Sequence, residues 1–329
     1  MAAVLNIGVI GLGVMGQRML ARLQPHERLQ TSLVWDARPE LVASTLQAYP
    51  QLRAASSAEQ LIAAPGLDSL YIATPPAAHL PYSELAFDAG LAVFCEKPLT
   101  VDFAAARATI ARIEREKQRA AVNFSLASAP GLAALQLAFG AASKLPLGAL
   151  QAVEIELGFA AWPRPWQAAA GAWLAERAEG GFTREVLSHF IFVLQRVLGP
   201  AQVRHSRVDY PADGRSAETA LEAELTALGL PLKVSARVAP EIEVADRNRM
   251  SWRASEGEIE LREWFGLTQQ RRGGPWQALG EPESARSTAQ AEQLEQWVAL
   301  IEGRSHSLPG YAEALAVQQT IEALLAGKA

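Results

Sequence analysis

The sequence predicts an α/β protein of two domains, a doubly wound parallel sheet followed by an α+β domain with a large, mainly antiparallel sheet. Three observations support this fold class. The chain has 329 residues, which suits two hydrophobic cores better than one. Apolar runs alternate with helix-period stretches over the first 125 residues. Beyond about residue 147, apolar and polar residues alternate singly. We therefore predict domains at residues 1–125 and 126–329.

The first domain alternates strand and helix. Buried strands are expected at residues 4–10, 33–35, 67–73, 91–95 and 120–124. Helices are expected between them, at residues 15–23, 39–48, 58–63, 77–89 and 102–118. A strand and a helix repeated in this way predict a parallel sheet with helices on both of its faces.

The second domain changes to a two-residue rhythm, which predicts strands with one apolar face. These strands are expected at residues 151–159, 218–225, 232–238, 249–253 and 258–262. A helix at residues 183–198, ended by Gly199 and Pro200, is expected to cover that face. Two closing helices are expected near residues 289–301 and 311–326.

Composition excludes several classes of protein. A net charge of −5 gives no basic surface for nucleic acid. We find no apolar run of the roughly 18 residues that a membrane span needs, and the first residues lack a secretory signal. The single cysteine, Cys95, excludes an internal disulfide and a multi-thiolate metal site. We expect a cytoplasmic protein without a metal.

A glycine-rich turn between the first strand and the first helix carries the strongest local signal. Its first glycine suits a tight turn, its second lets the backbone approach a pyrophosphate, and its third lets helix and strand pack closely. The helix N-terminus adds N–H groups and a positive dipole end for phosphates. The alternative is a tight turn that binds nothing. The motif is Gly11, Leu12, Gly13, Val14, Met15 and Gly16.

An acidic residue ends the second strand, twenty residues after Gly16. Asp36 is placed to accept hydrogen bonds from the adenosine ribose, which favours NAD over NADP. Arg38 leaves NADP possible, because an arginine at this position can lie along the adenine or bind a 2′-phosphate. A surface ion pair between the two is the alternative. We predict NAD as the cofactor and keep NADP as the second choice.

Two more segments follow strand ends, where ligands bind in doubly wound sheets. The first contains Thr74, Pro75 and His79, and the second contains Glu96 and Lys97. Lys97 suits a general acid/base for converting C–OH to C=O. Position alone allows other interpretations. The prolines also suit the start of a helix, His79 suits a helix residue whose ring is hydrogen-bonded, and Lys97 suits a solvent-exposed turn.

In order and spacing, the glycine motif, the Ala-Thr-Pro-Pro…His segment and Glu-Lys-Pro resemble the Gfo/Idh/MocA family, which includes glucose-fructose oxidoreductases and inositol dehydrogenases. The resemblance is close over residues 4–125 and looser beyond. It implies that Lys97 is catalytic, that Glu96 and His79 border the nicotinamide, and that substrates are sugars, cyclitols or related polyols. It also implies that Thr74 and Pro75 contact the cofactor.

The family's third motif, a glycine run followed by Asp, Gly and His on a helix, is altered here. Residues 180–189 retain two glycines and His189, while Glu185 replaces the aspartate and Leu187 the glycine. Four residues apart, Glu185 and His189 are expected on one helical face. The resemblance implies a catalytic and substrate-binding role for both. The alternatives are ion pairing with Arg184 or Arg196, or metal ligation, for which no third ligand stands nearby.

Two tryptophans flank an arginine after the first strand of the second domain. Trp162 and Trp166 suit stacking on the C–H face of a sugar, and Arg164 suits a hydroxyl or carboxylate. The same residues suit a stiff loop or a subunit contact equally well.

We therefore predict an NAD(P)-dependent oxidoreductase that transfers a hydride between nicotinamide and a carbinol or carbonyl of a sugar, cyclitol or polyol. The substrate is expected between the nicotinamide, Lys97 and the Glu185/His189 helix. One alternative keeps the fold and reduces a C=N or C=C bond. The other is a dinucleotide-binding regulator without turnover. Because family members commonly pair through the second sheet, a homodimer or homotetramer is expected.

Overall fold

The computed structural model describes residues 3–141, 143, 146–170 and 172–327. The chain divides into two compact units. The first comprises Met1–Phe124 and Glu292–Leu315, and the second Ser125–Ala291 and Ala316–Ala329. We predicted that every residue after 125 belongs to the second domain. In the structure, residues 292–315 pack with the first unit.

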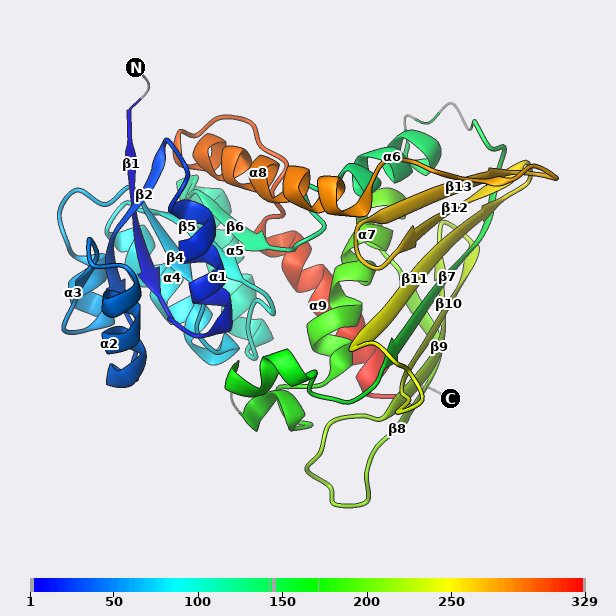
Figure 1. The fold of residues 1–329 in the computed structure, drawn as a ribbon, viewed down its shortest axis with the longest axis horizontal. Helices are drawn as coiled ribbons and strands as arrows, with labels where there is room; N and C mark the ends of the chain where they lie inside the picture. The colour runs from blue at the N-terminus through cyan, green and yellow to red at the C-terminus, as the bar shows by residue number, and fades with distance from the viewer. Residues whose placement is uncertain (1–2, 142, 144–145, 171, 328–329) are drawn as a thin grey trace. The chain divides into compact units, whose positions relative to one another are not determined.

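The first unit holds the predicted doubly wound parallel sheet (Figure 1). Its strand order is β3-β2-β1-β4-β5-β6, and every neighbouring pair runs parallel. The order therefore reverses between β1 and β4, which is where ligands bind in sheets of this kind. The strands are β1 (Leu5–Ile10), β2 (Leu29–Trp35), β3 (Arg53–Ala54), β4 (Ser69–Ile72), β5 (Ala92–Glu96) and β6 (Ala120–Asn123).

Five helices alternate with these strands. All five were predicted, with bounds that differ by up to two residues. The short edge strand β3 was not predicted, and β2 begins four residues earlier than expected. The helices are α1 (Val14–Leu23), α2 (Pro39–Ala48), α3 (Ala58–Ile62), α4 (His79–Asp88) and α5 (Phe103–Glu116).

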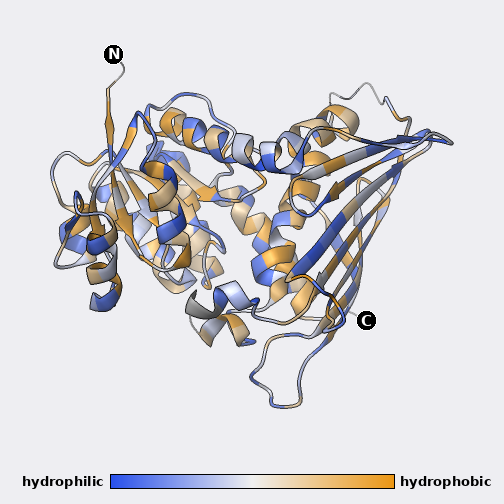
Figure 2. Cartoon of the chain, viewed as in Figure 1, coloured by the Kyte–Doolittle hydropathy of each residue, from blue (hydrophilic) through white to orange (hydrophobic). Residues whose placement is uncertain are grey.

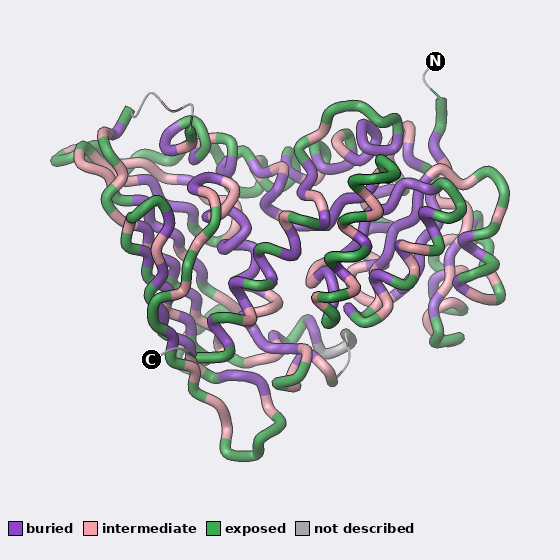
Figure 3. The backbone as a smooth tube through the Cα atoms, turned by 180° about the vertical axis from the view of Figure 1, so that it is seen from behind, coloured by how far each residue is buried: buried purple, intermediate pink, exposed green. Residues whose placement is uncertain are grey.

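A continuous apolar core lies around the central strands of the first unit (Figures 2 and 3). Ile7, Val9 and Phe94 are fully buried in it. The helix α8 (Pro282–Ile301), which returns from late in the chain, adds Trp297 to the same core. The indole N–H of Trp297 donates to the hydroxyl of Ser69 at the start of β4 (3.0 Å). This contact ties the late helix to the central sheet.

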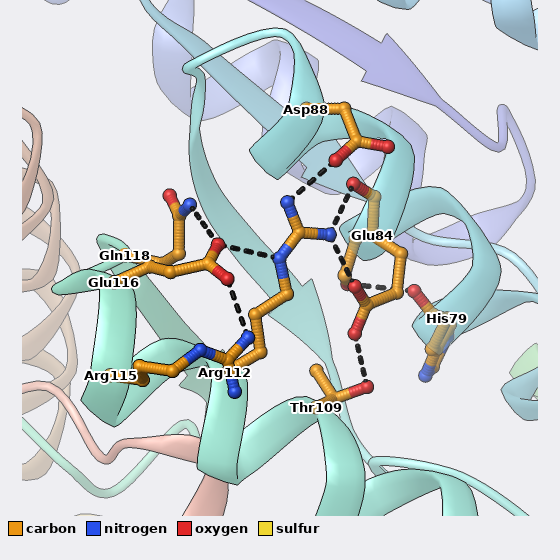
Figure 4. Close-up of polar contacts among 9 residues, drawn as sticks. His79, Glu84, Asp88, Thr109, Arg112, Arg115, Glu116 and Gln118 are labelled. Carbon is orange, nitrogen blue, oxygen red and sulfur yellow. Dashed lines mark hydrogen bonds and ion pairs between the residues drawn. The ribbon is translucent and has the colours of Figure 1, made fainter.

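An ion network joins α4 to α5 on the first unit (Figure 4). The guanidinium of Arg112 lies 2.6 Å from a carboxylate oxygen of Glu84, 2.6 Å from one of Asp88 and 2.8 Å from one of Glu116. The hydrogen bond from Arg112 lowers the pKa of Glu116 to about 2. Thr109 also donates to Glu84 (2.5 Å). Arg112 thus connects α5 to α4.

The second unit contains an eight-stranded sheet in the order β14-β13-β12-β11-β7-β10-β9-β8. All its neighbouring pairs are antiparallel except β7 with β10, which run parallel. This agrees with the predicted, mainly antiparallel sheet. The strands are β7 (Leu150–Phe159), β8 (Gln202–Asp209), β9 (Ala220–Ala227), β10 (Leu230–Val238), β11 (Asp246–Ala254), β12 (Gly257–Arg262), β13 (Gly266–Arg271) and β14 (Trp276–Ala278).

One face of this sheet is apolar and is covered by helices. Val153, Ile155 and Leu157 of β7 are buried on it, in register with buried residues of β10 and β11. The covering helix α7 (Ser188–Leu198) is buried along most of its length and packs beside α6 (Pro130–Phe139), which was not predicted. The strands β8, β13 and β14 were also missed. The last helix is α9 (Tyr311–Leu325).

The other face of the sheet carries paired charges. Arg249 of β11 bonds Glu156 of β7 (2.8 Å) and Glu260 of β12 (3.0 Å). Glu260 is only 1% exposed and also accepts from Arg262 (2.6 Å). Farther along the sheet, Arg253 of β11 pairs with Glu154 of β7 (2.5 Å). These cross-strand pairs make this face of the sheet polar and self-neutralising.

Among the helices that the structure describes, none combines the length and the apolar character of a membrane span.

Candidate functional site

The glycine turn has the shape that a dinucleotide loop requires. Gly11 has φ +94°, and a Cβ there would lie 2.3 Å from the carbonyl oxygen of Ala73, just after β4. A Cβ on Gly16 would lie 2.0 Å from the carbonyl oxygen of Gly11. Neither position tolerates a side chain, because ordinary contact begins at 3.4 Å. The first and third glycines thus hold β1, β4 and α1 in close contact at the switch point.

Gly13 differs, because space lies beside it. The nearest atom to a Cβ there is the guanidinium Nη2 of Arg38 at 3.4 Å, at the end of a flexible side chain. Gly13 is also the N-cap of α1, and no side chain caps that helix end. The first turn of α1 contains no acidic residue. A helix N-terminus of this kind, reached over a bare backbone, fits the pyrophosphate of a dinucleotide.

The carboxylate of Asp36 is hydrogen-bonded to the backbone of the glycine loop. Its Oδ2 accepts the backbone N–H of Leu12 (2.7 Å), and its Oδ1 accepts the backbone N–H of Arg38 (2.9 Å). The Arg38 side chain turns back, with Nε 3.2 Å from Oδ1, and remains about half exposed. Asp36 thus fixes the loop, and both of its oxygens accept hydrogen bonds from Leu12 or Arg38. The surface ion pair considered above is present, but its carboxylate is buried.

His79 links the two segments that follow β4 and β5. Its Nε2 lies 2.8 Å from the carbonyl oxygen of Thr74, and its Nδ1 lies 2.8 Å from that of Pro98. The ring is 1% exposed, and burial lowers its pKa. A neutral imidazole has one N–H, so only one of the two carbonyls receives it at a time. His79 therefore sits between the Thr74–Pro75 turn and the Lys97–Pro98 turn, inside the unit.

Glu96 belongs to a buried polar network. Its Oε1 accepts the phenol of Tyr71 on β4 and the side-chain N–H of Asn123 on β6 (2.7 Å). Gln293 of α8 then donates to Oδ1 of Asn123 (2.8 Å). Burial raises the pKa of Glu96 and raises that of Tyr71 well above its ordinary value. Next to this network, Lys97 is half-buried at the carboxyl end of β5.

In the second unit, neighbouring atoms leave no room for a side chain at Gly180 or Gly181 of the altered motif. A Cβ on Gly180 would lie 2.3 Å from the carbonyl oxygen of Trp173. Gly181 has φ +98°, and a Cβ there would lie 2.2 Å from Oε2 of Glu218. Glu218 is 2% exposed and accepts the backbone N–H of Thr183 (2.7 Å). A buried carboxylate thus caps the helix start that the glycines make room for.

The helix that follows is not the regular α-helix that we predicted. Thr183–Leu187 form a π-helical turn, and α7 begins at Ser188. The wider turn carries Glu185, which is half-buried, and His189 follows in the first turn of α7. A one-turn π-helix inside an α-helix is frequent at functional sites. His189 is 4% exposed, and its ring meets the indole of Trp264 edge to face, with centroids 5.3 Å apart.

The Trp162–Trp166 segment is held by internal contacts. The guanidinium of Arg164 lies 4.5 Å from the ring centroid of Trp166 and 5.7 Å from that of Trp162. Arg164 is 6% exposed, bonds the carboxylate of Asp246 and donates from Nε to Gln167 (2.9 Å). The Trp162 N–H donates to the backbone of residue 174 (2.9 Å). These contacts give the segment a packing role, and Trp166, 41% exposed, is its accessible part.

Several residues of these sites gave no signal in the sequence. Tyr71 and Asn123 lie inside apolar strands, Gln293 lies on a distant helix, and Glu218, Asn248 and Trp264 lie in weakly patterned strands and turns. Each becomes visible only once the strands are paired. Among the described residues, no group of three or more His, Cys, Asp or Glu side chains is arranged to hold a metal ion.

Fold and glycine loop together define the first unit as a dinucleotide-binding α/β domain. Residues 5–124 match the model of the Gfo/Idh/MocA oxidoreductase family, described as having an NAD-binding Rossmann fold. This match of the first unit is the one that its motifs predicted.

Two dehydrogenases match about a third of the chain. An inositol 2-dehydrogenase of Corynebacterium glutamicum (strain R) is 33% identical over 103 residues, which span 31% of this chain and 31% of that protein. The match thus covers about a third of the relative's length. A D-apiose dehydrogenase of Paraburkholderia graminis is 32% identical over 107 residues, 32% of this chain and 28% of that protein.

A solved structure extends the likeness to both units. A putative myo-inositol dehydrogenase of Sinorhizobium meliloti 1021 superposes with a TM-score of 0.76, at 21% identity, over 98% of this chain and 97% of that one. This confirms the predicted combination of a doubly wound sheet with a large, mainly antiparallel sheet.

Proposed function

We propose that the protein is a nicotinamide-dependent oxidoreductase acting on a sugar, cyclitol or related polyol. It would transfer a hydride between the cofactor and a carbinol or carbonyl carbon. The observation that carries the proposal is the glycine loop at the switch point, where two positions exclude any side chain and a third leaves the backbone bare. The family match of residues 5–124 and the names of the relatives support the same class of reaction.

Each chemical role follows from the type of side chain. When bound, nicotinamide supplies the carbon that exchanges the hydride. Lys97 would take the hydroxyl proton during oxidation and return it during reduction, because an amine at a strand end is suited to that exchange. We assign His189 and Glu185 to the substrate, His189 orienting the reacting hydroxyl. Glu185 carries its carboxylate one methylene farther out than the family's aspartate.

Two residues that resemblance associated with the nicotinamide end are better described as positioning residues. His79 bonds the backbone of the Thr74 and Pro98 segments, and Glu96 bonds Tyr71 and Asn123 in the interior. Both therefore support the Lys97 turn from behind. We propose that they fix the loop in which Lys97 lies, without exchanging protons with substrate.

For the cofactor, we propose a preference for NAD. The buried carboxylate of Asp36 repels a 2′-phosphate, and a ribose hydroxyl would replace the side chain of Arg38 as one of its donors. Arg38 is the one opposing feature, since its half-exposed guanidinium lies beside Gly13. Removal of Arg38 should therefore weaken NADPH binding and leave NADH binding nearly unchanged. Arg53→Ala, at an exposed arginine on β3, is the matched control.

The test begins with binding. We would titrate the wild-type chain, Arg38→Ala and Arg53→Ala with NADH and NADPH by nicotinamide fluorescence. Tighter binding of NADH supports the proposal, and NADPH binding lost only in Arg38→Ala would identify the residue that admits NADP. If neither cofactor binds, the oxidoreductase proposal is wrong.

Turnover is measured next on a panel of cyclitols, hexoses and pentoses with NAD. Lys97→Ala should reduce kcat by about 100-fold or more, the usual range for a lost general base. Arg107→Ala, at an exposed position of α5, is the control and should leave kcat unchanged. Full turnover in Lys97→Ala would refute the role of Lys97.

We also propose that the second sheet mediates a homodimer or homotetramer. The polar face formed by Glu154, Glu156, Arg249 and Arg253 neutralises its own charges, so it can be covered without burying unpaired ions. Light scattering at low and high salt measures the mass; a monomer at all concentrations would exclude the assembly.

A further inference from the structure

A strained hairpin loop stands beside His189. In the β12–β13 pair, Arg262 is opposite Gly266, which leaves Glu263, Trp264 and Phe265 as the loop. Glu263 has φ +47° and Trp264 has φ +71°. Positive φ is uncommon for residues other than glycine and is an outlier for a bulky side chain. The backbone N–H of Phe265 donates to the carbonyl of Glu263 (2.9 Å), which makes Trp264 the centre of a γ-turn of the rare, strained type.

Local structure explains the other positive φ angles of non-glycine residues in the described chain, but not this pair. Lys117 is the left-handed C-cap of α5. Leu228 stands before Gly229 in the two-residue turn between β9 and β10, where positive φ matches the twist of the strands. The loop at Glu263 and Trp264 is neither a helix end nor a two-residue turn. Strain of this kind persists only where the surroundings hold it.

A single buried residue holds the loop. The backbone carbonyl of Asn248 on β11 accepts the N–H of Glu263 (3.0 Å), and its side-chain Oδ1 accepts the N–H of Trp264 (2.7 Å). Asn248 is 2% exposed and shares the apolar face of the sheet with Met250 and Trp252. Its Nδ2 is buried without a hydrogen-bond partner in the described structure. The Asn248 side chain therefore supplies its Oδ1 as an acceptor on an apolar face, although its Nδ2 donor is left without a partner there.

The strained loop places the indole of Trp264 against the histidine. The Trp264 and His189 rings meet edge to face at 74°, with centroids 5.3 Å apart. The same indole packs on Phe190, the next residue of α7, at 5.5 Å. The indole therefore packs against the imidazole and against the residue that follows it on α7. Trp264 is itself only partly buried, so its remaining surface is accessible.

We propose that Trp264, held in its strained turn by Asn248, is the positioning residue for His189 and an apolar wall of the substrate site. This inference rests on the proposed function, which assigns His189 to the substrate. The chemistry fits, because a sugar or cyclitol ring presents C–H faces to an indole and hydroxyls to an imidazole. Substrates without such a face should gain nothing from Trp264.

The first experiment needs no activity. We would record the imidazole NMR signals of the wild-type chain, Trp264→Leu and Trp264→Phe, with His189 assigned by its loss in His189→Asn. Trp264→Leu should move the His189 signals more than those of the other four histidines, and Trp264→Phe should restore part of the shift. Trp276→Leu, at a 42% exposed tryptophan on β14, is the matched control and should leave His189 unmoved. Unmoved His189 signals in Trp264→Leu would overturn the proposal.

A second measurement adds function. With myo-inositol and NAD, or the best substrate of the panel, Trp264→Leu should lose on the order of 10- to 100-fold in kcat, the effect of a misplaced catalytic group. Its KM for NAD should stay unchanged, and Trp264→Phe should recover most of the loss. If the signals move but kcat does not, Trp264 has no positioning role. If the wild-type chain binds no cofactor, the proposed function fails separately, while the NMR result still tests the contact.

Asn248→Ala provides an independent variant. Without the acceptor on Asn248, the loop should relax, and the His189 signals should move in the direction seen in Trp264→Leu. Unchanged His189 signals in a folded Asn248→Ala chain would show that Asn248 does not hold the loop.

Discussion

Gly13 offers a sharp test of the cofactor site, because the structure separates its effect on folding from its effect on binding. A Cβ at Gly13 would meet only the mobile end of Arg38 at 3.4 Å, so Gly13→Ala should fold. The cost to stability should be the loss of a good N-cap, about 0.5–1 kcal/mol. The same methyl group would occupy the surface that the pyrophosphate must approach.

The expected loss of affinity follows from packing. Forcing one methyl into a close contact costs about 1–3 kcal/mol, which is roughly a 5- to 150-fold increase in Kd. We would measure the Kd of NADH by fluorescence titration and the free energy of unfolding by urea denaturation. Gly310→Ala, just before α9 and with no atom within 4 Å of the new Cβ, is the matched control in the same unit.

Gly16→Ala should behave differently. Its Cβ would lie 2.0 Å from the carbonyl oxygen of Gly11, so α1 and β1 must separate, and stability should fall together with binding. If Gly13→Ala instead bound NADH as tightly as the wild-type chain, the glycine loop would not be the pyrophosphate site. The reasoning would then fail at its first step.

Further variants test the buried carboxylates. Because burial raises the pKa of Glu96, the folded chain binds the proton of this carboxyl more tightly than the unfolded chain does. The stability of the wild-type chain relative to Glu96→Gln should therefore fall as pH rises above about 4.5. Melting temperatures of both chains from pH 4 to 8 measure this difference, and parallel curves would show that Glu96 is exposed. Glu260→Ala should cost about 1–2 kcal/mol in urea denaturation, because its arginine partners keep access to water, and the loss should shrink at high salt. Gly181→Ala combines φ +98° with a 2.2 Å approach to Glu218 and should cost at least about 2 kcal/mol in thermal unfolding, whereas Gly66→Ala, at φ +84° in open space, should cost less.

The strands that the sequence revealed are the ones that bury a face. In β7, β9 and β10, every second residue is apolar, and most of these residues are buried, so the alternation predicted the strands. The edge strands gave no such signal. In β8, Arg204, His205 and Arg207 are exposed, and Val203 and Val208 are only partly buried. Two-residue β3 and exposed β14 are held by backbone pairing with a neighbour. Pairing of this kind leaves little trace in composition.

The candidate site residues likewise divide into those set by local backbone geometry and those set by contacts between distant segments. Local backbone requirements, such as positive φ at Gly11 and close approach at Gly16, restrict the residue type and therefore show in the sequence. The π-helical turn at Thr183–Leu187 depends on Glu218, thirty-five residues away from Thr183. Contact between Trp264 and His189 depends on strand pairing and on Asn248. No periodicity predicts contacts that distant segments create.

Glu96 and Lys97 show why position at a strand end is not enough to assign a role. Successive residues of a strand point to opposite faces of the sheet. Glu96 lies in register with Asn123 of β6, and its carboxylate is bonded in the interior by Tyr71 and Asn123. Lys97 follows where the strand has ended, half-buried. A carboxyl group buried among partners has to be hydrogen-bonded there, and we therefore predict that Lys97, not Glu96, contacts the ligand. The two adjacent residues are therefore predicted to have different roles, because Glu96 is bonded in the interior and Lys97 is not fully buried.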